Sequence, residues 1–134
     1  MSWSISRSYQ SPDIISTTCS VGSDILIACG LDVILLDEET NQRWKRSLPF
    51  RVHSAAHASG KIGVLCGHGF HLLRVSDGSQ IGGGRSTTGG FSGILARPGG
   101  GWVLSCRKGQ IHVFNAEGRG IKRLDVGGVR RLIG

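Results

Sequence analysis

The sequence has few prolines and no long apolar stretch. Only three of its 134 residues are proline, and its 22 glycines follow no three-residue period, which excludes a collagen triple helix. No segment approaches the 18 or more apolar residues of a membrane-spanning helix. The 39% share of hydrophobic residues and the 19% share of charged residues are those of a folded domain rather than a disordered chain.

Helical periodicity and a secretion signal are also lacking. No stretch keeps a 3.6-residue apolar period over ten residues, and glycine interrupts every candidate helix. The N-terminus, residues 1–7, has no basic start followed by an apolar stretch, so it does not resemble a signal peptide. Four cysteines without such a signal indicate free thiols in a reducing compartment. The sequence therefore predicts a cytoplasmic β protein.

Three cysteines mark a repeat. Each ends a short apolar run, and they follow one another at steps of 37 and 40 residues, which is the spacing of propeller blades: Cys29, Cys66 and Cys106. Three residues after each cysteine comes a turn-forming residue: Asp32, Gly69 and Gly109. Twelve residues after each comes a residue that tolerates the left-handed backbone of a tight hairpin: Asn41, Gly78 and Gly118.

Each repeat predicts four short strands separated by turns. The expected strands are 13–20, 24–29, 32–37 and 42–48 in the first unit, 52–58, 61–67, 70–75 and 79–86 in the second, and 91–96, 102–107, 110–115 and 120–126 in the third. The second strand of each unit is almost continuously apolar, as in a sheet covered on both faces. The fourth is the most polar. We therefore expect the inner strands to be buried and the fourth strand to lie on a rim.

The segment 36–44 resembles the repeat motif of quinoprotein-dehydrogenase-like β-propellers. That motif has Asp, then Thr-Gly, then a Trp that docks on the neighbouring blade, and this copy keeps Asp37, Thr40 and Trp44. It has Asn41 in place of the glycine and is one residue short before the tryptophan. The later copies keep an acidic residue followed by glycine but lose the tryptophan. The resemblance implies propeller blades, and WD-repeat propellers match less well.

Two flanking segments extend the repeat. Residues 2–9 resemble an outermost strand, and residues 128–134 resemble the first strand of a further unit. The predicted fold class is thus all-β, one domain over 1–134, with about three and a half blades in units 13–50, 51–88 and 89–126. An incomplete ring leaves open edges, which invite pairing, so self-association of two chains is one expectation.

Basic side chains outnumber acidic ones by 16 to 9. They gather on the expected outer strands and towards the C-terminus: Arg43, Lys45, Arg46, Arg119, Lys122, Arg123, Arg130 and Arg131. Trp44 is the one aromatic residue close to them, whereas a single-strand binding groove needs several stacking rings. A solvated basic rim is the favoured interpretation, and contact with nucleic acid or another polyanion is the alternative.

No catalytic, cofactor-binding or metal-binding constellation is evident. His68 and His71 are three residues apart, which on a strand places them on opposite faces, and His53 and His57 belong to no metal motif. The cysteines, Cys19 included, fit structural roles as small hydrophobic residues. The segment 82–90 superficially resembles a phosphate-binding loop but lacks the lysine and the following helix.

The function predicted from these observations is that of a non-catalytic propeller-type module that presents its surface to a protein partner, with no cofactor. Binding of a polyanion through the basic rim is the first alternative. The second, which rests on the resemblance alone, is a fragment of a quinone-cofactor dehydrogenase.

Overall fold

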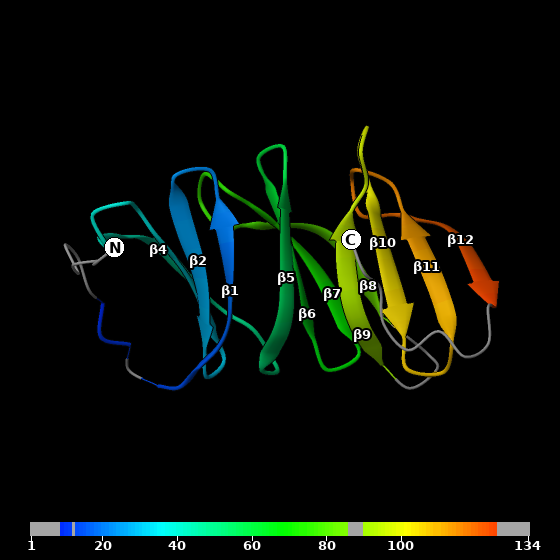
Figure 1. The fold of residues 1–134 in the computed structure, drawn as a ribbon, viewed down its shortest axis with the longest axis horizontal. Helices are drawn as coiled ribbons and strands as arrows, with labels where there is room; N and C mark the ends of the chain where they lie inside the picture. The colour runs from blue at the N-terminus through cyan, green and yellow to red at the C-terminus, as the bar shows by residue number, and fades with distance from the viewer. Residues whose placement is uncertain (1–8, 12, 86–89, 126–134) are drawn as a thin grey trace, which may run out of the picture.

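The computed structural model describes residues 9–11, 13–85 and 90–125, and these form three four-stranded antiparallel sheets (Figure 1). The first sheet holds β1 (Ile15–Val21), β2 (Asp24–Cys29), β3 (Asp32–Leu36) and β4 (Gln42–Ser47). The second holds β5 (Val52–Ala58), β6 (Lys61–Cys66), β7 (Gly69–Arg74) and β8 (Gln80–Arg85). The third holds β9 (Phe91–Ala96), β10 (Trp102–Cys106), β11 (Gln110–Phe114) and β12 (Gly120–Asp125).

The strands follow chain order within every sheet, as in a β meander. All twelve expected strands are present, and their bounds differ from the expected ones by at most two residues. The two expected flanking strands, 2–9 and 128–134, lie outside the described residues except for Tyr9. Among the described residues, no helix is long and apolar enough to cross a membrane.

The sheets stack face to face, and the middle sheet is covered on both sides. In β6, Ile62, Val64 and Cys66 pack against the first sheet. Leu65, between them, packs against the third sheet because successive side chains of a strand point to opposite faces. This explains the continuous apolar run of the second strands, and confirms that both sheet faces are covered where a neighbouring sheet is present.

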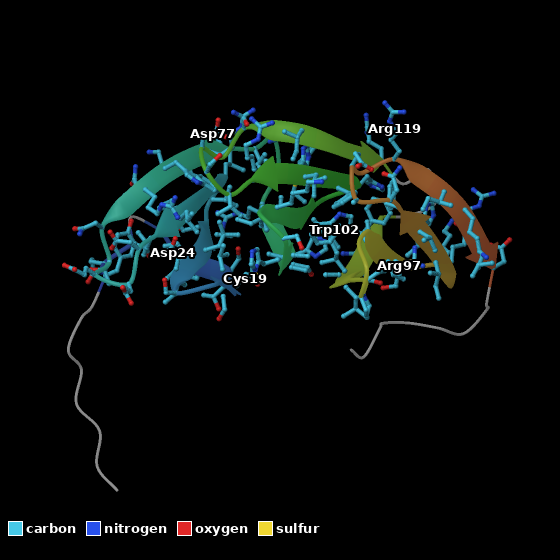
Figure 2. The ribbon with its side chains drawn as sticks, turned by 90° about the horizontal axis from the view of Figure 1, so that it is seen from above. Cys19, Asp24, Asp77, Arg97, Trp102 and Arg119 are labelled. Carbon is cyan, nitrogen blue, oxygen red and sulfur yellow. The ribbon has the colours of Figure 1, made fainter. Side chains whose placement is uncertain are left out.

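The stack is curved. Figure 2 shows β4, β8 and β12 along the convex side of an arc, whereas Cys19 of β1 lies on the concave side. The first strands, β1, β5 and β9, adjoin one another in sequence along the arc. Small side chains permit this approach: the Ser16 hydroxyl donates a hydrogen bond of 2.7 Å to the carbonyl of Val52 on the next sheet.

Burial follows the expected gradient with one exception. The last strand, β12, is exposed throughout, and β4 is exposed at most positions, as expected for a rim. The first strand β1 is also largely exposed, although inner strands were expected to be buried. Its counterpart β5 is half-buried between sheets, whereas no sheet of the described residues lies on the far side of β1.

In each sheet, a glycine with positive φ turns the hairpin between the second and third strands, here called the inner hairpin. In two of the three sheets this glycine is not the turn residue that the repeat predicts. The left-handed backbone falls at Gly30 and Gly67, one residue after the cysteine, with φ of 59° and 56°. Asp32 and Gly69, the expected turn residues, instead begin β3 and β7. In the third unit the hairpin is longer, and Gly109 takes the left-handed conformation with φ of 82°, as expected.

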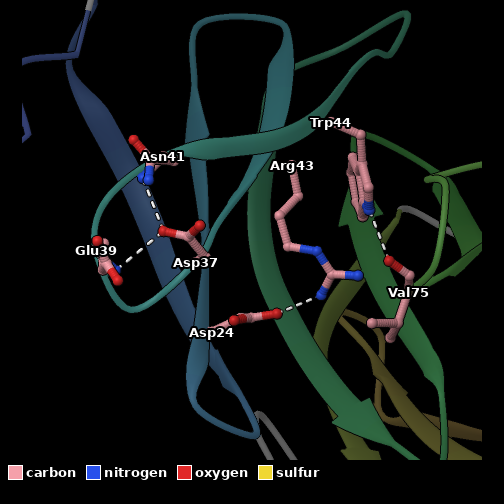
Figure 3. Close-up of polar contacts among 7 residues, drawn as sticks. All are labelled: Asp24, Asp37, Glu39, Asn41, Arg43, Trp44 and Val75. Atoms are coloured by element: carbon pink, nitrogen blue, oxygen red, sulfur yellow. Dashed lines mark hydrogen bonds and ion pairs between the residues drawn. The ribbon is translucent and has the colours of Figure 1, made fainter.

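The outer hairpin of the first sheet is organised by Asp37. Its Oδ1 accepts hydrogen bonds of 2.9 Å from the backbone N–H groups of Glu39 and Asn41, which closes the turn before β4 (Figure 3). Asn115 makes the same pair of bonds in the third sheet. The residue in the left-handed conformation is Thr40, with φ of 66°, and not Asn41 as the spacing predicted.

Thr40 therefore occupies the position that Gly118 fills in the third sheet. A β-branched residue at positive φ is strained, by about 1–3 kcal/mol. The substitution Thr40→Gly relieves this strain but adds about 0.5–1 kcal/mol of chain entropy to the unfolded state. We expect a net stabilisation of about 1 kcal/mol in urea unfolding, and a loss of stability would contradict this account of the turn.

Trp44 joins the first sheet to the second. Its indole Nε1 donates a hydrogen bond of 2.7 Å to the backbone carbonyl of Val75, beyond the end of β7 (Figure 3). Its ring covers Gly78, where an added Cβ would lie 2.6 Å from Cε3 of the indole. The tryptophan thus docks on the neighbouring sheet, as the resemblance implies.

In the turn that Trp44 contacts, the backbone N–H and the hydroxyl of Ser79 donate hydrogen bonds to the Asp77 carboxylate. These bonds lower the pKa of the Asp77 carboxyl.

A pair of alanine substitutions isolates this contact. Gly78 and Gly60 have φ of 75° and 78°, but nothing lies within 4 Å of a Cβ added at Gly60. Both substitutions suffer the same backbone strain, and only Gly78→Ala also collides with the indole. We expect Gly78→Ala to be about 1–3 kcal/mol less stable than Gly60→Ala in chemical denaturation. Equal stabilities would show that the tryptophan yields without cost.

Candidate functional site

An open cavity of about 470 Å³ lies beside the connection between the first and second sheets. Pro49 and Phe50 of this connection form one wall, and Phe70 of β7 contributes to the lining. Phe50 is 59% exposed, although three other phenylalanines of the chain are buried in strands. Aromatic side chains are enriched at surfaces through which proteins bind one another.

Polar groups line the same cavity. His68, His71 and Arg85 contribute to its walls. The Nδ1 atom of His71 is buried and has no hydrogen-bond partner among the described residues. An apolar wall with a guanidinium and two imidazoles suits an apolar side chain that is followed by a hydrogen-bond acceptor or an acidic group.

Local backbone geometry holds Phe50 in place. The N–H of Leu48 donates to the carbonyl of Leu31, which fixes the start of the connection against the inner hairpin of the first sheet. Gly67 turns beneath the aromatic ring, and a Cβ added there would lie 3.4 Å from Cγ of Phe50. The repeat pattern did not point to Phe50. The available signal was a phenylalanine placed in a connection, directly after a proline, rather than in an expected strand.

The basic residues do not form one surface. Arg43, Lys45 and Arg46 lie on β4 of the first sheet, whereas Lys122 and Arg123 lie on β12 of the third. The two strands are at opposite ends of the arc, with β8 of the middle sheet between them (Figure 2). Arg43 is also paired with Asp24 (Figure 3). Arg130 and Arg131 lie outside the described residues.

The histidines are not arranged as metal ligands in the described part of the chain. His68 lies in the turn before β7 and not on a strand, so the alternation argument does not apply, and both His68 and His71 line the cavity. Burial and the nearby Arg107 lower the pKa of His53. Within the described ranges, no group of three or more His, Cys, Asp and Glu side chains is arranged to hold a metal ion.

The repeat cysteines occupy equivalent positions. Cys29, Cys66 and Cys106 are buried at the ends of β2, β6 and β10, whereas Cys19 on β1 is only half-buried. Burial raises the pKa of the Cys19, Cys29 and Cys66 thiols, and Asp32 adds to the effect at Cys29. Raised values keep these groups protonated near neutral pH, and a protonated thiol is a poor nucleophile.

Thiol accessibility can be measured directly. In the native chain we expect an aromatic disulfide reagent at pH 8 to modify Cys19 first, because its side chain is partly accessible. The three buried thiols should react only in unfolded chain, or at the rate of local opening. The Cys19→Ser variant should lack the fast phase. Fast reaction of a second thiol in that variant would contradict the burial of the repeat cysteines.

The glycine-rich segment 82–90 does not form a phosphate-binding loop in its described part. Gly82, Gly83 and Gly84 belong to β8. Their missing side chains let other groups approach closely: a Cβ at Gly82 would collide with the carbonyl of Glu117, and one at Gly84 would lie 3.1 Å from Phe114. Gly82 and Gly84 therefore serve the packing of the second sheet on the third. Residues 86–89 lie outside the described residues.

Solved structures share this architecture. The chain is similar to BamB from Moraxella catarrhalis, with a TM-score of 0.80 and 20% identity over 90% of this chain and 40% of that one. The computationally designed Ika4 protein matches with a TM-score of 0.81 and 9% identity over 93% of this chain and 82% of that one. The β-propeller domain of Myceliophteria thermophila Cps50 (Swd1) matches with a TM-score of 0.70 and 14% identity, over 84% and 42%.

These similarities concern the fold. The chain spans 40% of the length of the BamB chain. No protein-family model and no curated protein matches the sequence. The structural matches include propellers of the two kinds that the sequence resembles, and they confirm the predicted fold class. The described residues are three consecutive four-stranded blades of a β-propeller fold.

Proposed function

We propose that this β-propeller module binds a protein partner through the cavity beside Phe50. The observation that carries the proposal is the exposure of the Phe50 ring on the wall of a cavity that also holds Phe70 and Arg85. Aromatic and arginine side chains are enriched where proteins bind one another, because they combine a large apolar area with specific hydrogen bonding. The module itself performs no chemistry in this proposal.

The geometry favours an extended peptide segment over a large flat surface. The cavity of about 470 Å³ accommodates one or two side chains, and Pro49 and Phe50 of the connection line it. A ligand with an apolar side chain next to an acidic one would bury the former against the exposed ring of Phe50. The carboxylate would then accept hydrogen bonds from Arg85, which presents donors in a planar fork.

Selection from a random twelve-residue peptide library displayed on phage tests the proposal. We expect enriched peptides that combine apolar and acidic residues and that bind the chain with micromolar affinity. Phe50→Ala should weaken this binding at least tenfold because the ring is lost, and Arg85→Gln should weaken it for peptides with an acidic residue.

Ile121→Ala is the matched control, since Ile121 is an exposed apolar residue on β12 of the third sheet and does not line the cavity. It should leave peptide binding unchanged. Failure to enrich any specific peptide, or equal binding by the wild-type chain and Phe50→Ala, would refute the proposal.

The two alternatives from the sequence stay predictions. A polyanion would meet the basic residues of β4 and β12 at separate ends of the arc, so each end offers only a few phosphate contacts. The slope of log affinity against log salt should then be shallow, about −3 for three contacts on duplex DNA. The quinone-dehydrogenase alternative rests on the family resemblance, and fold similarity does not transfer an activity.

A further inference from the structure

A second cavity, of about 440 Å³, lies where the second and third sheets meet. Two hairpins border it: Ser59 comes from the hairpin between β5 and β6, and residues 97–101 form the hairpin between β9 and β10. Trp102 of β10 and Ala116 of the turn before β12 also line it. It shares no lining residue with the cavity beside Phe50, so the two cavities are separate.

The indole N–H of Trp102 is buried and has no hydrogen-bond partner among the described residues, although the side chain is only 1% exposed. A Cβ added at Gly63 would lie 3.2 Å from Cζ3 of this ring, and Nε1 is on the opposite edge of the indole. By contrast, the N–H of Trp44, between the first and second sheets, is bound to the carbonyl of Val75. Because buried polar groups almost always have a partner, the indole of Trp102 is a donor available to a ligand.

Two cationic side chains line the same cavity. Lys61, the first residue of β6, is half-buried, and its Nζ donates a hydrogen bond of 2.9 Å to the carbonyl of Ala116. An ammonium group has three N–H donors, so this bond leaves donors for a ligand. Arg97 is exposed at the start of the hairpin between β9 and β10. In the described part of the chain, neither cation forms an ion pair with a carboxylate.

Apolar groups contribute the remaining wall. Ala58, Pro98 and Ala116 line the cavity together with Trp102. Gly99 carries no side chain that could fill it, and nothing lies within 4 Å of a Cβ added there. The volume is within the range of about 300–1,000 Å³ that is usual for sites of small ligands. The cavity therefore combines positive charge, an apolar wall and an unused indole donor.

From these groups we infer that the cavity binds a small oxyanion carried on a flat apolar body, such as an aromatic carboxylate or an aromatic phosphate. The anionic oxygens accept hydrogen bonds from Lys61 and Arg97, and hydrogen bonds between charged groups are the stronger ones. Carboxylate and phosphate share this chemistry, because each presents paired oxygens to a guanidinium. One further oxygen contact satisfies the indole N–H of Trp102, and the apolar body packs against Pro98.

Titration of the ¹⁵N-labelled chain with sodium benzoate at constant ionic strength, followed in assigned ¹H–¹⁵N spectra, tests the inference. We expect the indole N–H resonance of Trp102 to shift and saturate with a dissociation constant of about 1 mM, as befits so small a ligand. The resonance of Trp44 should stay in place because its N–H is already bound. Benzamide, which has the same ring without the charge, should bind about tenfold more weakly. Phenyl phosphate is the second arm, and the tighter of the two anions identifies the oxyanion.

A pair of arginine variants locates the binding. Arg97→Gln removes one cation from the cavity wall and should weaken the binding of benzoate about fivefold. Arg119→Gln is the matched control: it removes the same charge from the same sheet, but Arg119 is exposed on the convex side of the arc and does not line the cavity (Figure 2). It should bind benzoate like the wild type.

A Trp102 resonance that does not move, equal binding of benzoate and benzamide, or equal affinities of the two arginine variants would overturn the inference. The Trp102 resonance reports on this cavity, whereas peptide selection with Phe50→Ala reports on the other one. Either proposal can therefore fail without the other.

Discussion

Burial of apolar side chains on both faces of each sheet is the constraint on which the rest of the structure depends. A strand such as β6 alternates its side chains between two neighbours, so every residue from Ile62 to Cys66 faces another sheet. The first strands carry small residues for the same reason. The sheets can stack into a curved row only if these inner strands approach each other closely. At the outer side of the stack, Gly82 and Gly84 of β8 allow the third sheet to approach the second closely.

Much of this architecture could be predicted because the same sequence pattern occurs in three successive units. The cysteines at the ends of the second strands fix the register, and the apolar runs before them reveal that both faces are covered. The turns were less predictable, since a fixed offset from the cysteine ignores an extra residue in the hairpin of the third sheet. That insertion makes Thr40, and not Asn41, the counterpart of Gly118.

The candidate site could not be derived from the repeat because it lies where the repeat is interrupted. Phe50 belongs to a connection between units, and its exposure depends on how two sheets meet. The basic residues posed the opposite difficulty. They share equivalent strands in sequence, yet the arc separates β4 from β12. Sequence spacing thus located the elements well, but it could not say which surfaces these elements present together.

The glycine at position 63 has a wider consequence. Its missing side chain is the space that Ile94, Phe70 and Trp102 occupy, and a methyl group there would lie 2.7 Å from the Ile94 side chain. The corresponding position in the first sheet is Leu26, which a different neighbour covers. The units therefore share a backbone arrangement, but the side chains that pack at their faces differ in size. Exchanging the order of the blades would place a leucine where only a hydrogen fits, so blade order is itself encoded in the packing.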